Sequence, residues 1–306
     1  MAVLDPHHLQ ATTGAWRQLR GDRWALMGAA LVAGFVLLAV LAPLLTALSH
    51  TDPYTYDIEA LDAAGVPMGM FGGVSGAHWL GVEPQTGRDL FAILVYGART
   101  SLLVGLGATA VSVVAGTVVG VVAGYTGGFA DMLLSRFTDL MLAFPSLIFM
   151  IALGAIVPSS FPKALFIVLV IGAFGWPSVA RVVRGLTLTL RTRDFVLAAR
   201  AIGAPTSRIL RAEIWPNLAS SVTVLATMAV PGAITAEAAL SFLGIGVTPP
   251  TPSWGRTIAN AVSWIQVDPW YLLAPGAALF LLTLGFNMLG DGLRDAYDPR
   301  VSGSRG

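Results

Sequence analysis

The chain has 306 residues, of which 55% are hydrophobic and only 11% are charged. Soluble domains carry roughly 25% charged residues, so this composition indicates a bundle of membrane helices with little chain left for a soluble domain. The formal net charge of +1 says little about partners, and the lack of cysteine excludes disulfides, thiolate metal sites and cysteine nucleophiles.

Six stretches are long and apolar enough, or nearly so, to cross a bilayer core of about 30 Å, which takes about 20 helical residues. They cover residues 25–48, 100–130, 140–162, 164–180 (extending through 183), 214–236 and 271–290. The apolar run of the first is longer than the roughly 7–15 residues of a signal peptide, so we interpret it as an uncleaved anchor. The sequence therefore predicts an all-α membrane protein with six transmembrane helices.

The basic residues predict the orientation, because cytoplasmic loops are enriched in Lys and Arg. With the N-terminus inside, the inner segments hold 14 of the 18 basic residues, and the outer segments hold Arg88, Arg99, Lys163 and Arg256. Arginine supplies 17 of the 18, and alanine and glycine are abundant, which fits a GC-rich bacterial genome. We expect a multi-pass protein of the bacterial cytoplasmic (inner) membrane with both termini in the cytoplasm.

These predictions divide the chain into five parts. They are a cytoplasmic N-terminal segment (1–23), the first transmembrane helix (24–48), an extracytoplasmic loop (49–98), a core of five transmembrane helices (99–290) containing a polar loop at 190–216, and a cytoplasmic tail (291–306).

Small residues recur at four-residue steps in the second span, at Gly116, Gly120, Gly124 and Gly128. Such a face lets membrane helices approach closely, so we expect a packing interface. A moving interface connected with a gate is the alternative.

The loop at 190–216 is the most basic segment of the chain, although it lies between two apolar spans. Residues 192–201 fit a helix with one apolar face, formed by Phe195, Ala198, Ala199 and Ile202. Gly203 is expected to end that helix, Pro205 to begin a second, and Pro216 to finish the segment. Two interpretations remain open: an amphipathic loop resting on anionic lipid, and a docking surface for a cytoplasmic partner.

Three residues of the last two spans are candidates for a gate or pathway. Pro231 is expected to kink the fifth span, because proline removes a backbone hydrogen bond. Glu237 falls near the outer end of that span, where a hydrogen-bonding role and a role at an outer gate both remain open. Asn287 is the one strongly polar residue deep in the last third of the sixth span, and nothing in the sequence decides its role.

The polar loop resembles the cytoplasmic "EAA" loop of ABC-importer permeases, which runs E-A-A, three residues, Gly, nine residues, I-x-L-P. Ala198 and Ala199 match the two alanines, and Gly203 and Pro216 match the glycine and proline. Leu197 stands in the place of the Glu, and Glu213 and Trp215 stand in the places of the Ile and Leu. Four further segments resemble the C-type permease of dipeptide, oligopeptide and nickel importers. They are "GRDLFAILVYGARTSLLVG" (87–105), "LAFPSLIFMIAL" (142–153), "AEAALSFLGIGVTPPTPSWG" (236–255) and "NMLGDGLRDAYDPR" (287–300).

The resemblance implies a type I ABC importer permease fold, and a subunit that forms the pathway with a second homologous permease. It also implies two ATP-binding cassette ATPases, which bind ATP and Mg, and an extracytoplasmic solute-binding protein landing on residues 50–90 and 246–255. The ATPase-coupling residues would be Ala198, Ala199, Arg200, Gly203, Ala204 and Pro216. Membrane lipid is a further partner, and no nucleic acid is expected.

We expect no catalytic residue, metal or cofactor on this chain itself. It lacks the G-x-x-x-x-G-K-[ST] pattern that a P-loop needs, and its single lysine lies in "SFPKALF". The four histidines show no metal-binding spacing and lie outside the spans, which also disfavours an intramembrane enzyme. A nickel or other small-solute importer remains an alternative, and an ATP-independent secondary transporter fits less well, because neither midplane ionisable residues nor inverted repeats are found.

Overall fold

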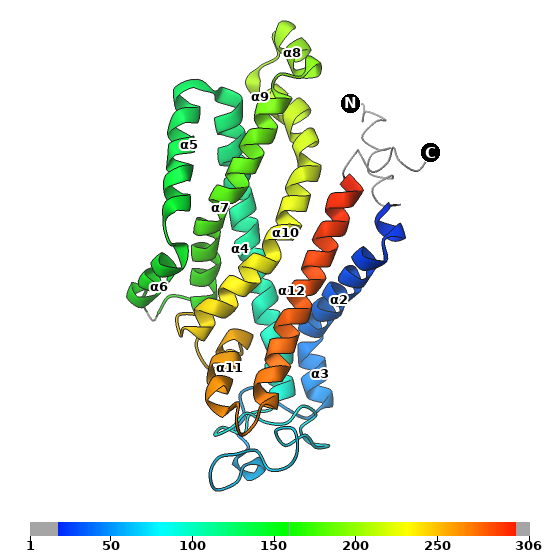
Figure 1. Ribbon diagram of the computed structural model, residues 1–306, viewed down its shortest axis with the longest axis vertical. Coiled ribbons are helices and arrows are strands. Elements are labelled where there is room, and N and C mark those ends of the chain that lie inside the picture. Colours follow the sequence, from blue (N-terminus) through cyan, green and yellow to red (C-terminus); the bar gives the residue numbers. More distant parts are fainter. Residues whose placement is uncertain (1–17, 159, 298–306) are drawn as a thin grey trace.

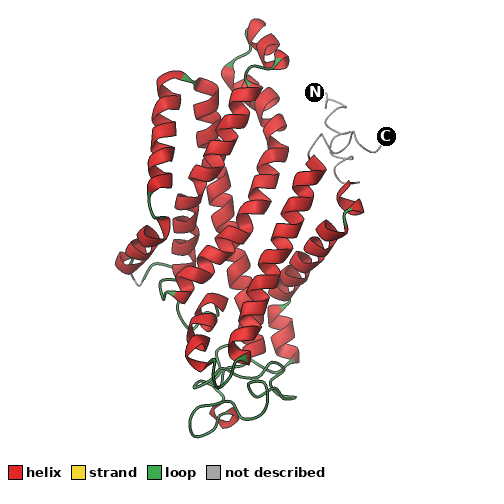
Figure 2. Ribbon diagram, viewed as in Figure 1, coloured by secondary structure: helices red, strands yellow, loops and turns green. Residues whose placement is uncertain are grey.

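The computed structural model describes residues 18–158 and 160–297, and within these ranges the only β structure is two isolated bridges in the first long loop (Figure 2). The helices in chain order are α2 (Arg23–Val40), α3 (Ala42–Leu48), η1 (Ile58–Ala60), α4 (Leu90–Thr126), α5 (Gly128–Ala143), α6 (Ser146–Ile156), α7 (Lys163–Leu190), α8 (Asp194–Ala201), α9 (Thr206–Ile209), the π-helical turn η2 (Leu210–Ile214), α10 (Trp215–Phe242), α11 (Trp254–Ala261), η3 (Val262–Trp264) and α12 (Trp270–Tyr297). The predicted all-α membrane fold is confirmed. The predicted termini at 1–17 and 298–306 lie outside the described residues.

In the part of the chain that the structure describes, five helices are long and apolar enough to cross a membrane: α2, α4, α7, the continuous helix Thr206–Phe242, and α12. A sixth span is present if α5 and α6, which meet at an angle of 81°, count as one broken span. The predicted first span is divided at Leu41, which separates α2 from α3. The second starts ten residues early, at Leu90, so the loop between α3 and α4 is shorter than the predicted loop 49–98.

The predicted third span, 140–162, is wrong as one straight helix. The chain turns back at Gly127, and α5 runs beside α7 and α4 before the bend at Pro145 (Figure 1). Charged residues of α5 made this segment look like a loop, yet two of them pair with arginines of α7. Arg184 donates two hydrogen bonds to Asp131, at 2.5 and 2.8 Å, and Arg181 binds Asp139 at 2.7 Å.

Glycines bring α4 into direct backbone contact with α7. A Cβ on Gly116, Gly120 or Gly124 would lie 2.7–2.8 Å from a carbonyl oxygen of α7. The predicted packing interface is therefore confirmed at these three positions. The fourth predicted member, Gly128, lies outside the interface, because it begins α5 with a φ of 57° and no atom within 4 Å of its Cβ position.

The two ends of the bundle differ in character (Figure 1). The start of α2 and the end of α12 lie at the same end as α8 and α9, whereas the long loop between α3 and α4 lies at the opposite end, beside α11. The arrangement agrees with the predicted placing of the polar loop on the side where the first span begins and the last span ends.

Candidate coupling and translocation sites

The loop between α7 and α10 forms two short helices that extend beyond the ends of their neighbours (Figure 1). Gly203 follows α8 with a φ of 76°, a left-handed backbone conformation that residues other than glycine rarely adopt. The Gly203 amide donates to the Arg200 carbonyl at 2.9 Å, and the Ala204 amide to the Ala199 carbonyl at 3.0 Å. Pro205 then precedes the first residue of α9. The predicted Gly/Pro corner is confirmed.

The side of α8 that packs on the bundle is not the predicted one. Phe195 and Ala198 are exposed, Ala199 is half-buried, and Ile202 is 80% exposed, whereas Val196 is fully buried. An eight-residue helix makes only about two turns, so one central side chain can anchor it and leave the rest of its apolar surface in solvent. We name the exposed apolar residues Phe195, Leu197, Ala198 and Ile202 the α8 tip.

The α8 tip is connected to three spans. Val196 shares an apolar cluster with Val183 of α7 and with Leu218 of α10. The Arg200 guanidinium lies over the ring of Tyr125 in the last turn of α4, 4.9 Å from its centroid, a cation–π geometry. Just before α8, Arg191 donates to the Gly124 carbonyl at 2.9 Å. Contacts therefore join α8 and the segment just before it to α4, α7 and α10.

The prediction that Pro216 finishes the segment is wrong. This proline lies in the first turn of α10, inside one helix that continues from Thr206 to Phe242. The π-helical turn η2 directly precedes it, so the wider turn coincides with the position where proline lacks its N–H. The Asn217 side chain donates to the Glu213 carbonyl at 2.7 Å, which satisfies one acceptor there.

Glu237 is completely buried and surrounded by three serine hydroxyls. Ser241 and Ser253 donate to its Oε1 at 2.8 and 3.0 Å, and Ser101 donates to Oε2 at 3.0 Å. These bonds connect α10 with α4 and with the residue that precedes α11. The serine cluster was missed from the sequence, because its members are up to 152 positions apart between Ser101 and Ser253.

The other two pathway candidates lie apart from Glu237. Pro231 is buried in the interior of α10, and Asn287 is exposed on α12. The structure therefore does not bring Glu237 and Asn287 together into one site.

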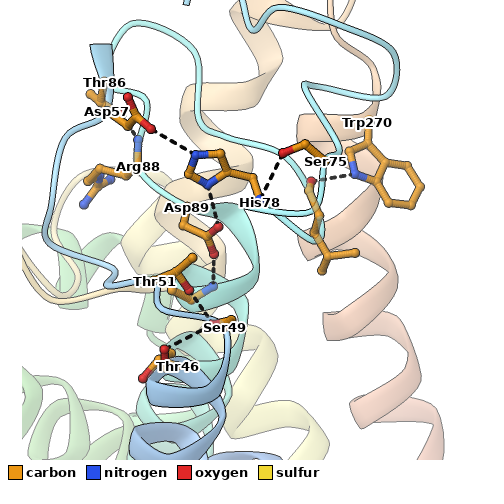
Figure 3. Close-up of polar contacts among 12 residues, drawn as sticks. Thr46, Ser49, Thr51, Asp57, Ser75, His78, Thr86, Arg88, Asp89 and Trp270 are labelled. Carbon is orange, nitrogen blue, oxygen red and sulfur yellow. Dashed lines mark hydrogen bonds and ion pairs between the residues drawn. The ribbon is translucent and has the colours of Figure 1, made fainter. Parts of the chain in front are cut away.

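At the opposite end of the bundle, His78 connects two parts of the first long loop (Figure 3). Its Nδ1 lies 2.9 Å from Asp89, which also caps α4 by accepting from the Ala92 amide at 2.7 Å, and its Nε2 lies 3.1 Å from Asp57. Burial lowers the pKa of His78, but the hydrogen bonds and charges of Asp89 and Asp57 outweigh it, so the pKa is raised above 6.5. An imidazolium donates to both carboxylates at once. We call these three residues the His78 clamp.

A second polar cluster joins the same loop to α12. Glu83 is almost fully buried, accepts from the phenol of Tyr271, and forms an ion pair with Arg88 at 2.6 Å. The indole of Trp270 donates to the Leu80 carbonyl at 3.0 Å (Figure 3). Both tethers come from aromatic residues at the start of α12.

Among the described residues, no group of three or more His, Asp or Glu side chains could hold a metal ion. Several polar groups of the loop end are instead paired with one another, as in the His78 clamp and the Glu83–Arg88 pair. One end of the bundle therefore carries the protruding apolar α8 tip, and the other carries the loop between α3 and α4, which is held by polar contacts.

Two protein families match the chain. The one described as "Binding-protein-dependent transport system inner membrane component" matches residues 116–303, and the one described as "N-terminal TM domain of oligopeptide transport permease C" matches residues 12–64. The chain is 40% identical to the dipeptide transport system permease protein DppC of Alkalihalophilus pseudofirmus over 94% of this chain and 89% of the relative. It is 38% identical to the glutathione transport system permease protein GsiD of Salmonella typhimurium over 94% and 90%. It is also 35% identical to the oligopeptide transport system permease protein OppC of Bacillus subtilis over 94% and 89%.

Proposed function

The chain belongs to the family of binding-protein-dependent transport system inner membrane components, and on this basis we propose that it is the permease subunit of an ATP-driven importer of dipeptides or oligopeptides. The peptide cargo is supported by relatives named for dipeptide, oligopeptide and glutathione transport, which cover most of both chains. As a transport permease it is not itself an enzyme.

We further propose that the α8 tip docks into an ATPase partner. The observation that carries this proposal is the combination of exposure and attachment: Phe195, Leu197 and Ile202 face solvent, while Val196 and Arg200 fix the same helix to the spans. An exposed apolar cluster beside exposed arginines, here Arg193 and Arg200, is typical of a protein contact surface. In this arrangement ATP and Mg are bound by two partner ATPases, whose closure moves α8.

The remaining partners follow from the two ends of the bundle. If α8 faces the cytoplasm, the loop between α3 and α4 and the segment before α11 face outward, where a solute-binding protein would deliver peptide. A second homologous permease would complete the pathway. Nickel as cargo has less support, since the relatives named above are peptide or glutathione permeases.

The test is co-purification of ATPases with the full complex in detergent, comparing the native chain with Ile202→Asp. Ile202 is 80% exposed with an ordinary backbone conformation, so the charge disturbs docking without the strain that a side chain at Gly203 would add. Thr192→Asp is the matched control, because it adds the same charge at an exposed residue before α8.

We expect Ile202→Asp to lose the ATPases and ATP-driven uptake of a labelled dipeptide while keeping the second permease, and Thr192→Asp to keep all three. If the Ile202 variant retains its ATPases and uptake, the α8 tip is not the docking surface. If the native complex contains no ATPase and shows no ATP-driven uptake, the importer assignment itself is wrong.

A further inference from the structure

One face of α10 carries uncharged polar side chains at steps of three or four residues through the length of a membrane-spanning helix. We name this set the α10 ladder: Asn217, Ser220, Thr223, Thr227 and Thr235, with Pro231 at the remaining step. At about 100° per residue, these positions fall within a sector of about 120°. Asn217, Thr223 and Thr235 are exposed, Ser220 and Thr227 are half-buried, and Pro231 is buried.

The ladder presents hydrogen-bond acceptors outward. The hydroxyls of Thr223, Thr227 and Thr235 donate back to carbonyls four residues earlier, at 2.8, 3.0 and 2.8 Å. Their donors are thus satisfied within the helix, and the hydroxyl oxygens can still accept from outside. Pro231 has no N–H, so the carbonyl of Thr227 loses its usual helical partner at the centre of the ladder.

The exposed face of the neighbouring α4 has the opposite chemistry. Between Arg99 and Thr126, which are the exposed polar residues at its two ends, that face is apolar, and its members are Leu103, Leu106, Ala110, Val114, Val118 and Val122. That face suits contact with hydrocarbon, where unsatisfied polar groups cost several kcal/mol. Because both faces belong to the same bundle, the contrast indicates that the α10 ladder faces water.

The ladder carries no charge. Between Trp215 and Phe242 the only ionisable residue is Glu237, and its side chain is fully buried behind the serine hydroxyls. Gly232, beside the ladder, is exposed, and a Cβ there would have no atom within 4 Å. The face therefore combines open space with neutral hydrogen-bonding groups.

We propose that the α10 ladder lines the water-filled translocation path and contacts the amide backbone of a passing peptide without selecting the charge of its side chains. This inference rests on the proposed transport function and names the residues of its path. Peptide amides donate to hydroxyl and carbonyl oxygens, and neutral groups spread along a path hold such a cargo weakly enough to release it at each step, as conduction requires.

The first test measures water access by single-cysteine labelling, for which this chain is suited because it contains no cysteine. Thr223→Cys and Thr227→Cys are compared with Val114→Cys in membranes containing the whole complex, using a charged, membrane-impermeant thiol reagent on both faces. Val114 is 65% exposed on the apolar face of α4. Val114 lies at a depth in the bundle comparable to that of Thr223 and Thr227. Val118 and Val122 of α4 adjoin Ile214 and Trp215 of the α10 helix, and Gly105 adjoins Ile234, so position 114 falls between these two levels.

We expect the two ladder cysteines to react at least tenfold faster than the cysteine at 114. Reaction of the ladder cysteines only with a lipid-soluble maleimide would place the ladder in lipid. Reaction with neither reagent would place it against another protein surface. Either result overturns the proposal.

The second test addresses charge selection with Thr227→Asp and Thr227→Lys. The measurement is the rate of ATP-driven uptake of a basic and of an acidic dipeptide by vesicles. Compared with the native chain, the aspartate variant should raise the ratio of basic to acidic uptake at least fivefold. The lysine variant should shift the ratio the opposite way. Equal ratios in all three chains, with uptake intact, would overturn the ladder proposal and leave the transport function standing. Absence of uptake in the native chain would instead contradict the transport function.

Discussion

The contact between α4 and α7 leads to a quantitative prediction for Gly120→Ala. A Cβ at Gly120 would lie 2.7 Å from the Ala180 carbonyl oxygen, 2.8 Å from the Val183 Cβ and 3.0 Å from the Arg184 amide nitrogen. Two of these atoms belong to the backbone, so a side-chain rotation cannot relieve the clash. Ordinary contact begins near 3.4 Å, so the helices must separate locally by about 3.4 − 2.7 = 0.7 Å.

Overpacking of this kind costs about 1–3 kcal/mol, whereas replacing a helical glycine by alanine otherwise gains roughly 0.5–1 kcal/mol. We therefore expect Gly120→Ala to be destabilised by about 1 kcal/mol and by at most about 2.5 kcal/mol, measured as a lower midpoint of thermal unfolding of the purified complex. Gly185→Ala is the control, because it lies on α7 with no atom within 4 Å of its Cβ position, and it should melt at or above the native temperature. The packing argument is refuted if the two variants melt alike.

The His78 clamp and the serine hydroxyls around Glu237 give further predictions. Because the pKa of His78 is raised, the stability contributed by the clamp is present below about pH 6.5 and is lost as pH rises through the raised pKa. The protection of residues 49–89 against hydrogen exchange, corrected for the intrinsic pH dependence of amide exchange, should therefore fall as pH rises through that pKa in the native chain and not in His78→Asn; equal corrected pH profiles would contradict a protonated clamp. Glu237→Ala leaves three buried serine hydroxyls without their acceptor and should cost at least about 2 kcal/mol, whereas Glu237→Gln keeps an acceptor and should cost about 1 kcal/mol or less. Thermal unfolding measures both, and equal losses would show that the cluster requires a carboxylate.

The long apolar helices could be predicted from the sequence, because burial in hydrocarbon imposes a length and composition on each span. The third span could not, because a charge count cannot distinguish a loop from a helix whose charges are paired. Asp131 and Asp139 are acceptable in α5 only because Arg184 and Arg181 of α7 lie opposite them. These ion pairs are tertiary contacts between two helices, and the local sequence of α5 does not encode them.

The polar loop shows the same limit on a smaller scale. Its corner at Gly203 and Pro205 follows from the backbone preferences of those two residues, so the sequence predicts it well. The buried side of α8 does not follow from periodicity, because an eight-residue helix is oriented by one contact, that of Val196. The true apolar tip, with Leu197 exposed, was therefore found only in the structure.

The contacts between α8 and the spans bear on how the proposed docking would act on the rest of the bundle. The glycines of α4 lie against the backbone of α7, and close-packed interfaces of this kind transmit displacement rather than deform. Arg200 and Arg191 attach the loop to the end of α4, and the helix beginning at Thr206 continues without interruption into the α10 ladder. In the proposed mechanism, closure of the ATPases therefore moves α4, α7 and α10 as one unit. The wall of the path is part of that unit, so it changes position at the moment the coupling loop does.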